Sequence, residues 1–538
     1  MPIFRLLLKT IPILMICFFI YGCSLKSKSK VSNTSIIPYS FERYKIQLGN
    51  EKHQTILTGF LTAQKNSELI VLYITEDNHR NIDIYTYQEG IWEKKYHVIL
   101  RPRVMFVDIV SIGKKDLLLT YEPNQLNWFD IDAMIERPLM DISLDFKPDN
   151  EKVIYQIDIT KDLNGDGYDD IVMPDYDGFW ISTQLENGSF RKPIKIGAKE
   201  PFLEKTALGF NTTYRDVGIN SLTIKWYLSR VHQIDYNRDN RTDLVFWNND
   251  HYLVYYQQKD GDFSIDPYTF TSNVSFNADS AYSIAFDFTG ENMFALIFGV
   301  KKNINRKVLY TFRDMNNDGI SDMVIHALKG RGLGNQQSLF EIHYGKPIPN
   351  AIMFTKNVDI TLEPKGPAGG LLPWGYSSQW IKDFDGDGDI DIVFKDVDTT
   401  LLGMTRALTR NVIYQSLDFF EFGNHTYTPK PTLRRKIKPK LDKGKSLGVY
   451  FPIALFDDLN GDNRADLIVG HNWSEMHVYV GISDSKLFPK EPQIIKISLP
   501  NDERNVRLVD LNRDNKKDIL IYYPFGQKAH KMTLMTSK

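Results

Sequence analysis

Six short segments of this 538-residue sequence concentrate side-chain oxygen atoms at a fixed spacing. Each has Asp at position 1, Asp or Asn at position 3, Asp at position 5, Gly or Asn at position 6, and Asp at position 9. We call them Asp loops 1 to 6, in chain order: residues 162–170, 235–243, 314–322, 383–391, 458–466 and 510–518. An apolar run follows each loop, so we predict that every loop opens a buried strand.

The chemistry that suits these oxygen atoms is calcium binding, because Ca²⁺ takes roughly 6–8 oxygen ligands. The varied position 7 would contribute its backbone carbonyl, and Gly or Asn at position 6 tolerates the positive φ of a tight wrap. We therefore predict up to six structural calcium ions. The predicted ligands are Asp162, Asn164, Asp166, Tyr168, Asp170, Asp235, Asn237, Asp239, Arg241, Asp243, Asp314, Asn316, Asp318, Ile320, Asp322, Asp383, Asp385, Asp387, Asp389, Asp391, Asp458, Asn460, Asp462, Arg464, Asp466, Asp510, Asn512, Asp514, Lys516 and Asp518.

Position 12 separates the Asp loops from the EF-hand, which has a bidentate Glu there. In the Asp loops position 12 is always apolar: Met173, Phe246, Ile325, Phe394, Val469 and Ile521. The chain therefore leaves each loop as a buried strand, and we expect structural ions and not sensor switches. The alternative is a set of Asp/Asn/Gly turns without an ion, above all where Asn at position 6 has basic neighbours.

Two weaker copies precede the six Asp loops. Asp108–Asp116 keeps the outer two Asp residues but has Val110 and Ile112 at positions 3 and 5, so we expect no tight ion there. Phe60–Glu68 keeps only the apolar strand that follows. The eight loop positions begin 48 to 79 residues apart, a spacing that suits one four-stranded antiparallel sheet per repeat. The predicted fold class is all-β, a seven- or eight-bladed β-propeller with calcium loops, preceded by a lipoprotein signal peptide.

Aromatic hairpins follow the loops, with Asn187-Gly188 and Asp260-Gly261 as their predicted turns. The loop, the apolar strand and the later hairpin resemble the FG-GAP or VCBS repeats of integrin-α-like propellers. The resemblance covers residues 42–530 and implies a propeller over residues 42–538 in which calcium stiffens each blade. We expect closure to pair early strands such as Lys45–Leu48 with the last repeat, because a closed ring leaves no free sheet edge.

The N-terminus has the pattern of a secretory signal over residues 1–22, with Arg5 and Lys9 before an apolar run of about ten residues. Gly22 and Cys23 resemble a bacterial lipobox, which implies lipidation (palmitate among the acyl groups) at Cys23. Residues 23–41 would then form a flexible tether, and the protein would be a membrane-anchored lipoprotein of the cell envelope, at the outer membrane or cell surface. An uncleaved anchor helix is the alternative. Loss of Arg5 and Lys9 would change the formal charge from −2 to −4, which gives no general case for a nucleic-acid partner.

The ligand or substrate is the property of this protein that its sequence indicates least. Gly444–Gly448 has the spacing Gly-x-Ser-x-Gly, but it follows a basic run and not the apolar strand that a nucleophile elbow requires, and His-Glu-x-x-His does not occur. We therefore expect a non-enzymatic binding, adhesion or envelope interaction module that recognises a glycan or a protein. Trp374, Tyr376 and Trp380 are candidate ligand-binding residues, with packing against the propeller as the equal alternative. His471 and His477 are expected to be structural or exposed. A polysaccharide lyase or hydrolase on the same scaffold is the alternative function, and a scaffold in an envelope complex is a third.

Overall fold

The chain divides into two units, Met1–Pro38 and Tyr39–Lys538, and the second contains all the residues that the computed structural model describes. It describes residues 39–51, 54–62, 64–145, 153–198, 231–276, 303–331, 336–364, 381–397, 401–410, 412, 414–438, 454–483, 486–500, 505–523 and 530–538. The predicted signal segment and Cys23 lie outside the described residues. Among the described residues, no helix has the length and apolar character needed to cross a membrane.

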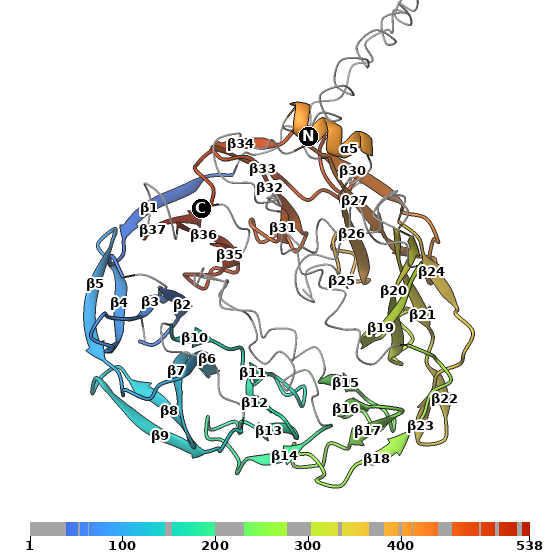
Figure 1. Cartoon of the computed structure of the whole chain (residues 1–538), viewed down its shortest axis with the longest axis horizontal. Coiled ribbons are helices and arrows are strands. Elements are labelled where there is room, and N and C mark those ends of the chain that lie inside the picture. Colours follow the sequence, from blue (N-terminus) through green and yellow to red (C-terminus); the bar gives the residue numbers. More distant parts are fainter. Residues whose placement is uncertain are drawn as a thin grey trace, which may run out of the picture. The chain divides into compact units, whose positions relative to one another are not determined.

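Eight antiparallel sheets follow one another around a ring in chain order within Tyr39–Lys538 (Figure 1). Blade 1 contains β2 (Thr55–Gly59), β3 (Glu68–Ile74), β4 (Arg80–Gln88) and β5 (Ile91–Ile99). Blade 2 contains β6 (Phe106–Ile112), β7 (Lys115–Glu122), β8 (Gln125–Asp130), β9 (Ile135–Asp141) and the parallel β10 (Tyr155–Gln156). Blade 3 contains β11 (Thr160–Lys161), β12 (Asp170–Asp175), β13 (Gly178–Ser182) and β14 (Ile194–Ile196). Blade 4 contains β15 (His232–Ile234), β16 (Asp243–Asn248), β17 (His251–Tyr255) and β18 (Tyr268–Phe270).

The second half of the ring repeats this plan with two additions. Blade 5 contains β19 (Asn303–Arg313), β20 (Asp322–Arg331), β21 (Gln336–His343) and β24 (Ile360–Leu362), with a side hairpin of β22 (Lys346–Ile348) and β23 (Ala351–Met353). Blade 6 contains β25 (Ile381–Lys382), β26 (Asp391–Val397), β27 (Gln415–Phe420) and β30 (Leu433–Ile437), with a side hairpin of β28 (Phe422–Gly423) and β29 (Thr426–Tyr427). Blade 7 contains β31 (Ala454–Asp457), β32 (Asp466–Asn472), β33 (Glu475–Tyr479) and β34 (Gln493–Lys496). Blade 8 contains β35 (Val506–Val509), β36 (Asp518–Tyr523), β37 (Lys531–Ser537) and β1 (Phe41–Gln47).

The first strand closes the ring as the outermost strand of blade 8. β1 pairs antiparallel with β37 over its whole length, from Phe41 opposite Ser537 to Gln47 opposite Lys531. The expected pairing of Lys45–Leu48 with the last repeat is therefore confirmed, and the blade number, which the sequence left at seven or eight, is eight.

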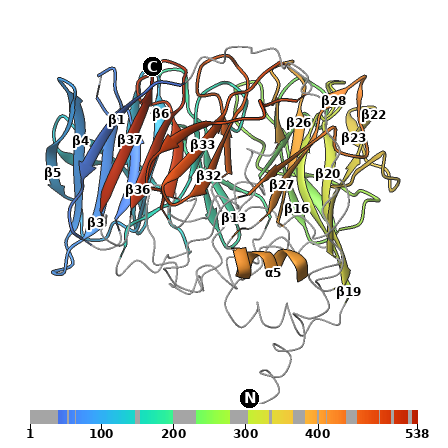
Figure 2. The ribbon, with the colours of Figure 1, turned by 90° about the horizontal axis from the view of Figure 1, so that it is seen from above.

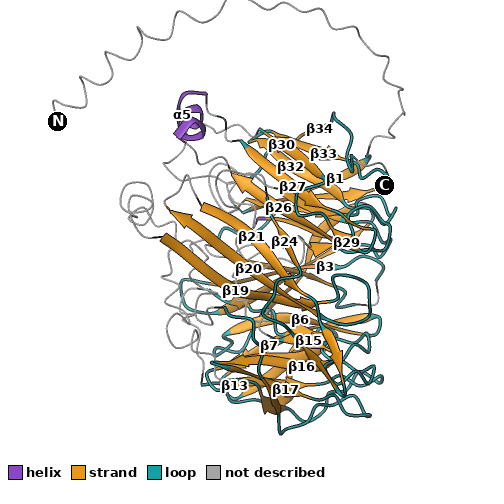
Figure 3. Ribbon diagram, turned by 90° about the vertical axis from the view of Figure 1, so that its right-hand side faces the viewer, coloured by secondary structure: helices purple, strands orange, loops and turns teal. Residues whose placement is uncertain are grey.

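Apolar side chains hold the blades together face to face. All six residues of β12 are buried, because a blade inside the ring is covered on both faces. Phe179 of blade 3 lies 5.4 Å, ring centre to ring centre, from Phe246 of blade 4, within the range of favourable aromatic pairs. The core is thus a series of inter-blade layers, and Figure 3 shows how strongly strands dominate the fold.

Residues 399–447 end in a basic run that begins at Arg434-Arg435-Lys436, and from these residue types a solvated loop is expected. Their described part contains β27 and β30 of blade 6 and the helix α5 (Leu401–Arg410), which lies beyond the strand ends in Figure 2. The basic run supplies an edge strand, in which the Arg435 guanidinium lies 4.0 Å from the centre of the Tyr479 ring of blade 7. An arginine that packs on an aromatic ring and donates to backbone carbonyls of the next blade can stabilise the contact between the two blades. The charge of the basic run did not by itself predict this packing.

Candidate metal centres

All six Asp loops lie at the same place in their blades, between the first and second strands. Each ends at the first residue of a buried strand, as predicted, and the structure shows that this is the second strand of the blade: Asp170, Asp243, Asp322, Asp391, Asp466 and Asp518. The two weaker copies lie at the matching turns, 60–68 between β2 and β3 and 108–116 across β6 and β7. The repeat in the sequence is thus a repeat in space.

The backbone of every Asp loop turns through the left-handed region twice. At position 6, φ is 87° in Gly167, 64° in Asn240, 81° in Gly319, 93° in Gly388, 63° in Asn463 and 64° in Asn515. This agrees with the reason given for Gly or Asn there. At position 4, φ is also positive: 78° in Gly165, 61° in Arg238, 60° in Asn317, 80° in Gly386, 79° in Gly461 and 55° in Arg513. The second turn was missed because arginine occupies it in two loops, at a cost of about 1–2 kcal/mol each.

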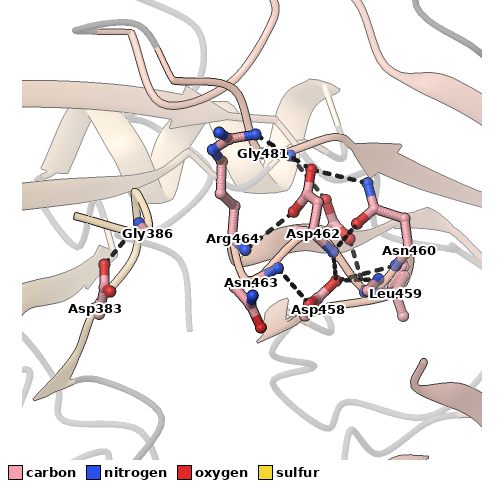
Figure 4. A network of polar contacts seen from close by, with 11 residues as sticks. Asp383, Gly386, Asp458, Leu459, Asn460, Asp462, Asn463, Arg464 and Gly481 are labelled. Atoms are coloured by element: carbon pink, nitrogen blue, oxygen red, sulfur yellow. Dashed lines mark hydrogen bonds and ion pairs between the residues drawn. The ribbon is translucent and has the colours of Figure 1, made fainter. Parts of the chain in front are cut away.

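The side chain at position 1 caps the loop that it opens. In Asp loop 5, Asp458 Oδ1 accepts a hydrogen bond from the backbone N–H of Gly461 (2.7 Å), and Oδ2 accepts one from Asn463 (2.7 Å; Figure 4). The side-chain amide of Asn460 donates to Asp462 Oδ2 (3.1 Å), and Asp462 Oδ1 accepts from the N–H of Arg464 (3.0 Å). The oxygens of positions 1, 3 and 5 are therefore turned inward by the loop's own backbone.

Position 9 has a structural role that spacing alone did not reveal. Asp466 is fully buried. Its Oδ2 accepts from the N–H of Leu459 (2.8 Å) and its Oδ1 from the N–H of Gly481, beyond the third strand (2.7 Å). The same two bonds recur in all six loops, at Asp170, Asp243, Asp322, Asp391, Asp466 and Asp518. Each of these carboxylates joins three parts of its blade.

Burial raises the pKa of every position-9 carboxyl, because a low dielectric disfavours the charged form. The pKa is raised to about 6 in Asp243, Asp466 and Asp518, to about 7 in Asp170 and Asp322, and to about 8 in Asp391. The backbone N–H bonds oppose this effect, and other loop carboxylates add to it. A bound cation would favour the ionised forms.

Asp loop 4 has the donor set that fits a calcium ion best. One carboxylate oxygen from each of Asp383, Asp385 and Asp391 lies within 4.8 Å of the other two. Burial, and then the charges of Asp387 and Asp383, raise the pKa of Asp385. A carboxylate oxygen that accepts one hydrogen bond keeps a second lone pair, so the backbone bonds of Asp391 do not prevent it from binding an ion.

The donor sets of the other loops also fit calcium, with one fewer carboxylate because position 3 is Asn. In two of them an arginine at position 7 competes for the carboxylate at position 5. Arg241 pairs with Asp239, and Arg464 Nη1 lies 3.4 Å from Asp462 Oδ2. Calcium at any Asp loop stays a prediction, as does the carbonyl of position 7 as a ligand.

In the weaker copies, backbone contacts replace the carboxylate cluster. Glu68 takes the place of the position-9 Asp, with its Oε2 accepting from the N–H of Leu61 (2.8 Å). Asp116 Oδ2 accepts from the N–H of Phe60 (2.8 Å). Val110 and Ile112 belong to β6, so the turn offers no side-chain oxygens at positions 3 and 5.

Neighbouring loops are joined to one another by backbone hydrogen bonds. The N–H of Ala465 donates to the carbonyl of Phe384 (3.2 Å), and that of Lys517 to the carbonyl of Asp458 (3.0 Å). The N–H of Ser67 continues the series by donating to Leu511 (2.8 Å). Asp loops 4, 5 and 6 and the weaker copy of blade 1 are thus connected in series, and order in one of them supports the next.

Three further polar clusters were not predicted as sites. His471, Glu475 and His477 meet on the hairpin of blade 7, and Asp145, Asp175 and Asp177 meet in blade 3. The blade 3 cluster is already neutralised in part by Lys195, whose Nζ lies 2.9 Å from Asp175 Oδ2. A third cluster brings Asp108, Asp158 and Arg507 together from blades that are distant in sequence. The candidate ligand residues Trp374, Tyr376 and Trp380 lie outside the described residues.

Comparison with known families finds one match within the chain. Residues 458–521, which hold Asp loops 5 and 6 and the strands after them, match the family described as FG-GAP-like repeat. This chain is an eight-bladed β-propeller with an FG-GAP-like repeat. The matched segment begins at Asp458, where an Asp loop opens, so the family repeat and the structural repeat share their starting point.

Solved structures similar to this propeller are distant in sequence. They include Sqt1 from Chaetomium thermophilum (7% identity, TM-score 0.37, 93% of this chain and 100% of that one). A structure of BBS1N in complex with ARL6DN, soaked with mercury, has 8% identity and a TM-score of 0.30, over 93% of this chain and 97% of that one. The periplasmic gluconolactonase PpgL of Pseudomonas aeruginosa has 11% identity and a TM-score of 0.28, over 83% of this chain and 96% of that one. No curated protein matches the chain.

Proposed function

We propose that this propeller is an exported, calcium-stabilised lipoprotein that acts as a non-enzymatic binding module in the cell envelope. The observation that carries the calcium part is the geometry of Asp loop 4, where three carboxylates converge. Close carboxylates repel one another unless a proton or a cation compensates their charge. The N-terminal signal pattern with Cys23 supports export and lipid anchoring.

Calcium would act on stability and not on chemistry. Each loop joins the first, second and third strands of its blade through the position-9 carboxylate, and backbone hydrogen bonds join Asp loops 4, 5 and 6 to one another in series. An ion that binds the folded form alone adds stability by mass action, about 2.7 kcal/mol per site at a concentration 100 times its Kd. Calcium at the rim would thus hold the loop face rigid for a ligand, a glycan or a protein.

The test is thermal unfolding of the full chain, in calcium and in excess chelator, together with native mass spectrometry. We expect up to six bound ions and a melting temperature that falls on chelation. An unchanged melting temperature in chelator, with no calcium in the mass spectrum, would sink the calcium proposal. The ligand is then sought with a glycan array and with proteins that co-purify from native membranes.

Lipid anchoring has its own test, because the sequence contains a matched pair of cysteines. We expect Cys23→Ser to lose incorporation of labelled palmitate and to leave the membrane fraction. Cys17→Ser, inside the apolar run of the signal, should keep both. Equal labelling of the two variants would contradict the lipobox.

The alternative of a polysaccharide-active enzyme is favoured by one observation, the cluster of Asp108, Asp158 and Arg507. Burial, and then the charge of Asp158, raises the pKa of the Asp108 carboxyl. Burial lowers the pKa of the Arg507 guanidinium, and the two carboxylates oppose that change. A carboxyl with a raised pKa beside a second carboxylate is the pairing used in acid–base chemistry on sugars.

A glycan panel separates this alternative from a binding module. Turnover that is lost in Asp158→Asn and kept in the exposed control Asp177→Asn would favour the enzyme. Binding without turnover by the wild-type chain would favour the module. Asp108 is a poor choice for substitution, because its Oδ2 accepts from the N–H of Ile159 at 2.7 Å and so joins blades 2 and 3.

A further inference from the structure

Three metal-ligating side chains meet on the hairpin between β32 and β33. His471, Glu475 and His477 each offer one ligand atom, and the three atoms lie within 4.8 Å of one another. Asp loop 5 precedes β32 and this hairpin follows it. The cluster therefore lies at the end of β32 remote from the Asp loop and is independent of it.

A break in the strand register places His471 in this group. The β32–β33 ladder pairs Gly470 with Met476 and then Asn472 with Glu475, so His471 is the extra residue of a β-bulge. A bulge redirects a side chain that regular pairing would send to the other face. Glu475 and His477, two residues apart on β33, share one face by alternation.

A neighbouring amide holds the carboxylate of this cluster. Asn472 Nδ2 donates to Glu475 Oε2 (3.0 Å), and Asn472 Oδ1 accepts from the backbone N–H of Ser474 (2.8 Å). The hairpin turn thus holds the Asn472 amide in place, and this amide holds the Glu475 carboxylate in place. Support of this kind from a second residue is what orients carboxylate ligands in metal sites.

The rings of the two histidines in this cluster lie against each other. Their rings are stacked, 4.3 Å apart at 11°. The Nε2 atom of His477 is buried and has no hydrogen-bond partner among the described residues. A neutral imidazole with an unused ring nitrogen is the form that binds a metal.

We propose that His471, Glu475 and His477 bind one divalent transition-metal ion of the Zn²⁺ class. Two imidazoles and one carboxylate suit zinc and are a poor set for calcium, which prefers oxygen. Bonds of about 2.0–2.2 Å require the three ligand atoms to draw closer together. Rotation of the side chains, which are all partly exposed, would bring the ligand atoms together. Three protein ligands leave a coordination position open for water or for a side chain of a bound partner.

The experiment is a Zn²⁺ titration of the full chain by calorimetry, with calcium in large excess to occupy the Asp loops. Co²⁺ is used as a second probe, since its absorption spectrum reports its ligands and coordination number. The variants are His471→Ala, His477→Ala and the conservative Glu475→Gln. The control is His79→Ala, a change at an exposed histidine on the β3–β4 turn.

We expect one Zn²⁺ per chain beyond the calcium sites, and affinity reduced by more than about tenfold in each cluster variant. His79→Ala should bind as the wild type does. Zinc binding that is equal in wild type and cluster variants would overturn the proposal, and so would a wild-type chain that takes up no zinc. If the alanine variants fail to fold, the proposal is tested by the zinc affinity of Glu475→Gln and by the Co²⁺ spectrum of the wild-type chain. A spectrum without histidine ligation contradicts it.

Discussion

Gly386 of Asp loop 4 lies so close to Arg464 of Asp loop 5 that a Cβ atom on Gly386 would be 3.1 Å from Arg464 Cγ and 3.2 Å from the carbonyl oxygen of Asn463. Figure 4 shows the two loops side by side. Gly388, two residues on, has no heavy atom within 4 Å of the same construction. Both glycines have positive φ, 80° and 93°. Alanine at either position would therefore strain the backbone, but only alanine at Gly386 would also press against Asp loop 5.

We therefore predict that Gly386→Ala destabilises the propeller more than Gly388→Ala does. Each substitution costs about 1–2 kcal/mol for a left-handed alanine, and the first adds about 1–3 kcal/mol of overpacking against blade 7. Melting temperatures of both variants in excess calcium measure the difference. Equal losses would mean that the loops do not bear on one another.

Asp385 makes Asp loop 4 the loop with four Asp residues at positions 1, 3, 5 and 9. Asp385→Asn gives it the pattern of the other five, and we expect about tenfold weaker calcium binding at this loop, because carboxylate number tunes affinity. Calcium is first removed with a chelator and then titrated back in a calorimeter, which measures the affinity of the tightest class of calcium sites. Asp389→Asn is the matched control at position 7, where the carbonyl is the predicted ligand, and it should leave that class in place.

Asp391 should matter for stability even without calcium. The two oxygens of Asp391 accept from the backbone N–H groups of Phe384 and Phe422. In Asp391→Asn an NH₂ group replaces one of these oxygens, and it cannot accept a hydrogen bond from the N–H that it faces. We expect a loss of about 1–3 kcal/mol, measured as a lower melting temperature in excess chelator. A variant that melts with the wild type under chelation would show that position 9 acts through the ion alone.

The two arginines at position 4 offer an opportunity for stabilisation. Arg238 is exposed with φ of 61°, so Arg238→Gly should raise stability by about 0.5–1 kcal/mol after the entropy of glycine is counted. Arg513 has φ of 55°, but its guanidinium lies 3.8 Å from the centre of the Phe60 ring. Loss of that contact costs about 0.5–1 kcal/mol, so Arg513→Gly should gain little. The reverse order of melting temperatures would contradict this account.

His326 predicts an acid-sensitive contribution to stability. It is 1% exposed, and burial lowers its pKa from 6.5 to about 4. The unfolded chain therefore binds a proton that the folded chain does not, and stability is lost as pH falls from about 6.5 toward 4. The loss amounts to at most about 3 kcal/mol. The imidazole of His326 packs against the Phe340 ring, and a phenylalanine in its place could keep that contact without titrating. His326→Phe should therefore flatten this part of the pH profile. The control variant, His79→Ala at an exposed histidine, should leave this part of the profile in place.

The sequence alone was enough to predict the local chemistry of this protein. The spacing of Asp, Asn and Gly predicted six loops, their place before a buried strand and the positive φ at position 6, because a nine-residue loop is governed by its own backbone and side chains. The spacing of the eight loop positions predicted the propeller, and the rule that a closed ring leaves no free sheet edge predicted that Lys45–Leu48 pairs with the last repeat. The apolar residues at position 12 excluded an EF-hand.

Tertiary structure decided what depends on contacts between distant residues. Blades 1 and 2 lack the Asp pattern, so only strand pairing could count eight blades. The second hydrogen bond of Asp391 reaches Phe422, 31 residues away, past the unpredicted α5, and no local pattern records such a bond. Arg507 approaches Asp108 because blades 8 and 2 flank blade 1. His471 meets His477 because one residue bulges from β32, and a shift in register is settled by the packing of the whole sheet.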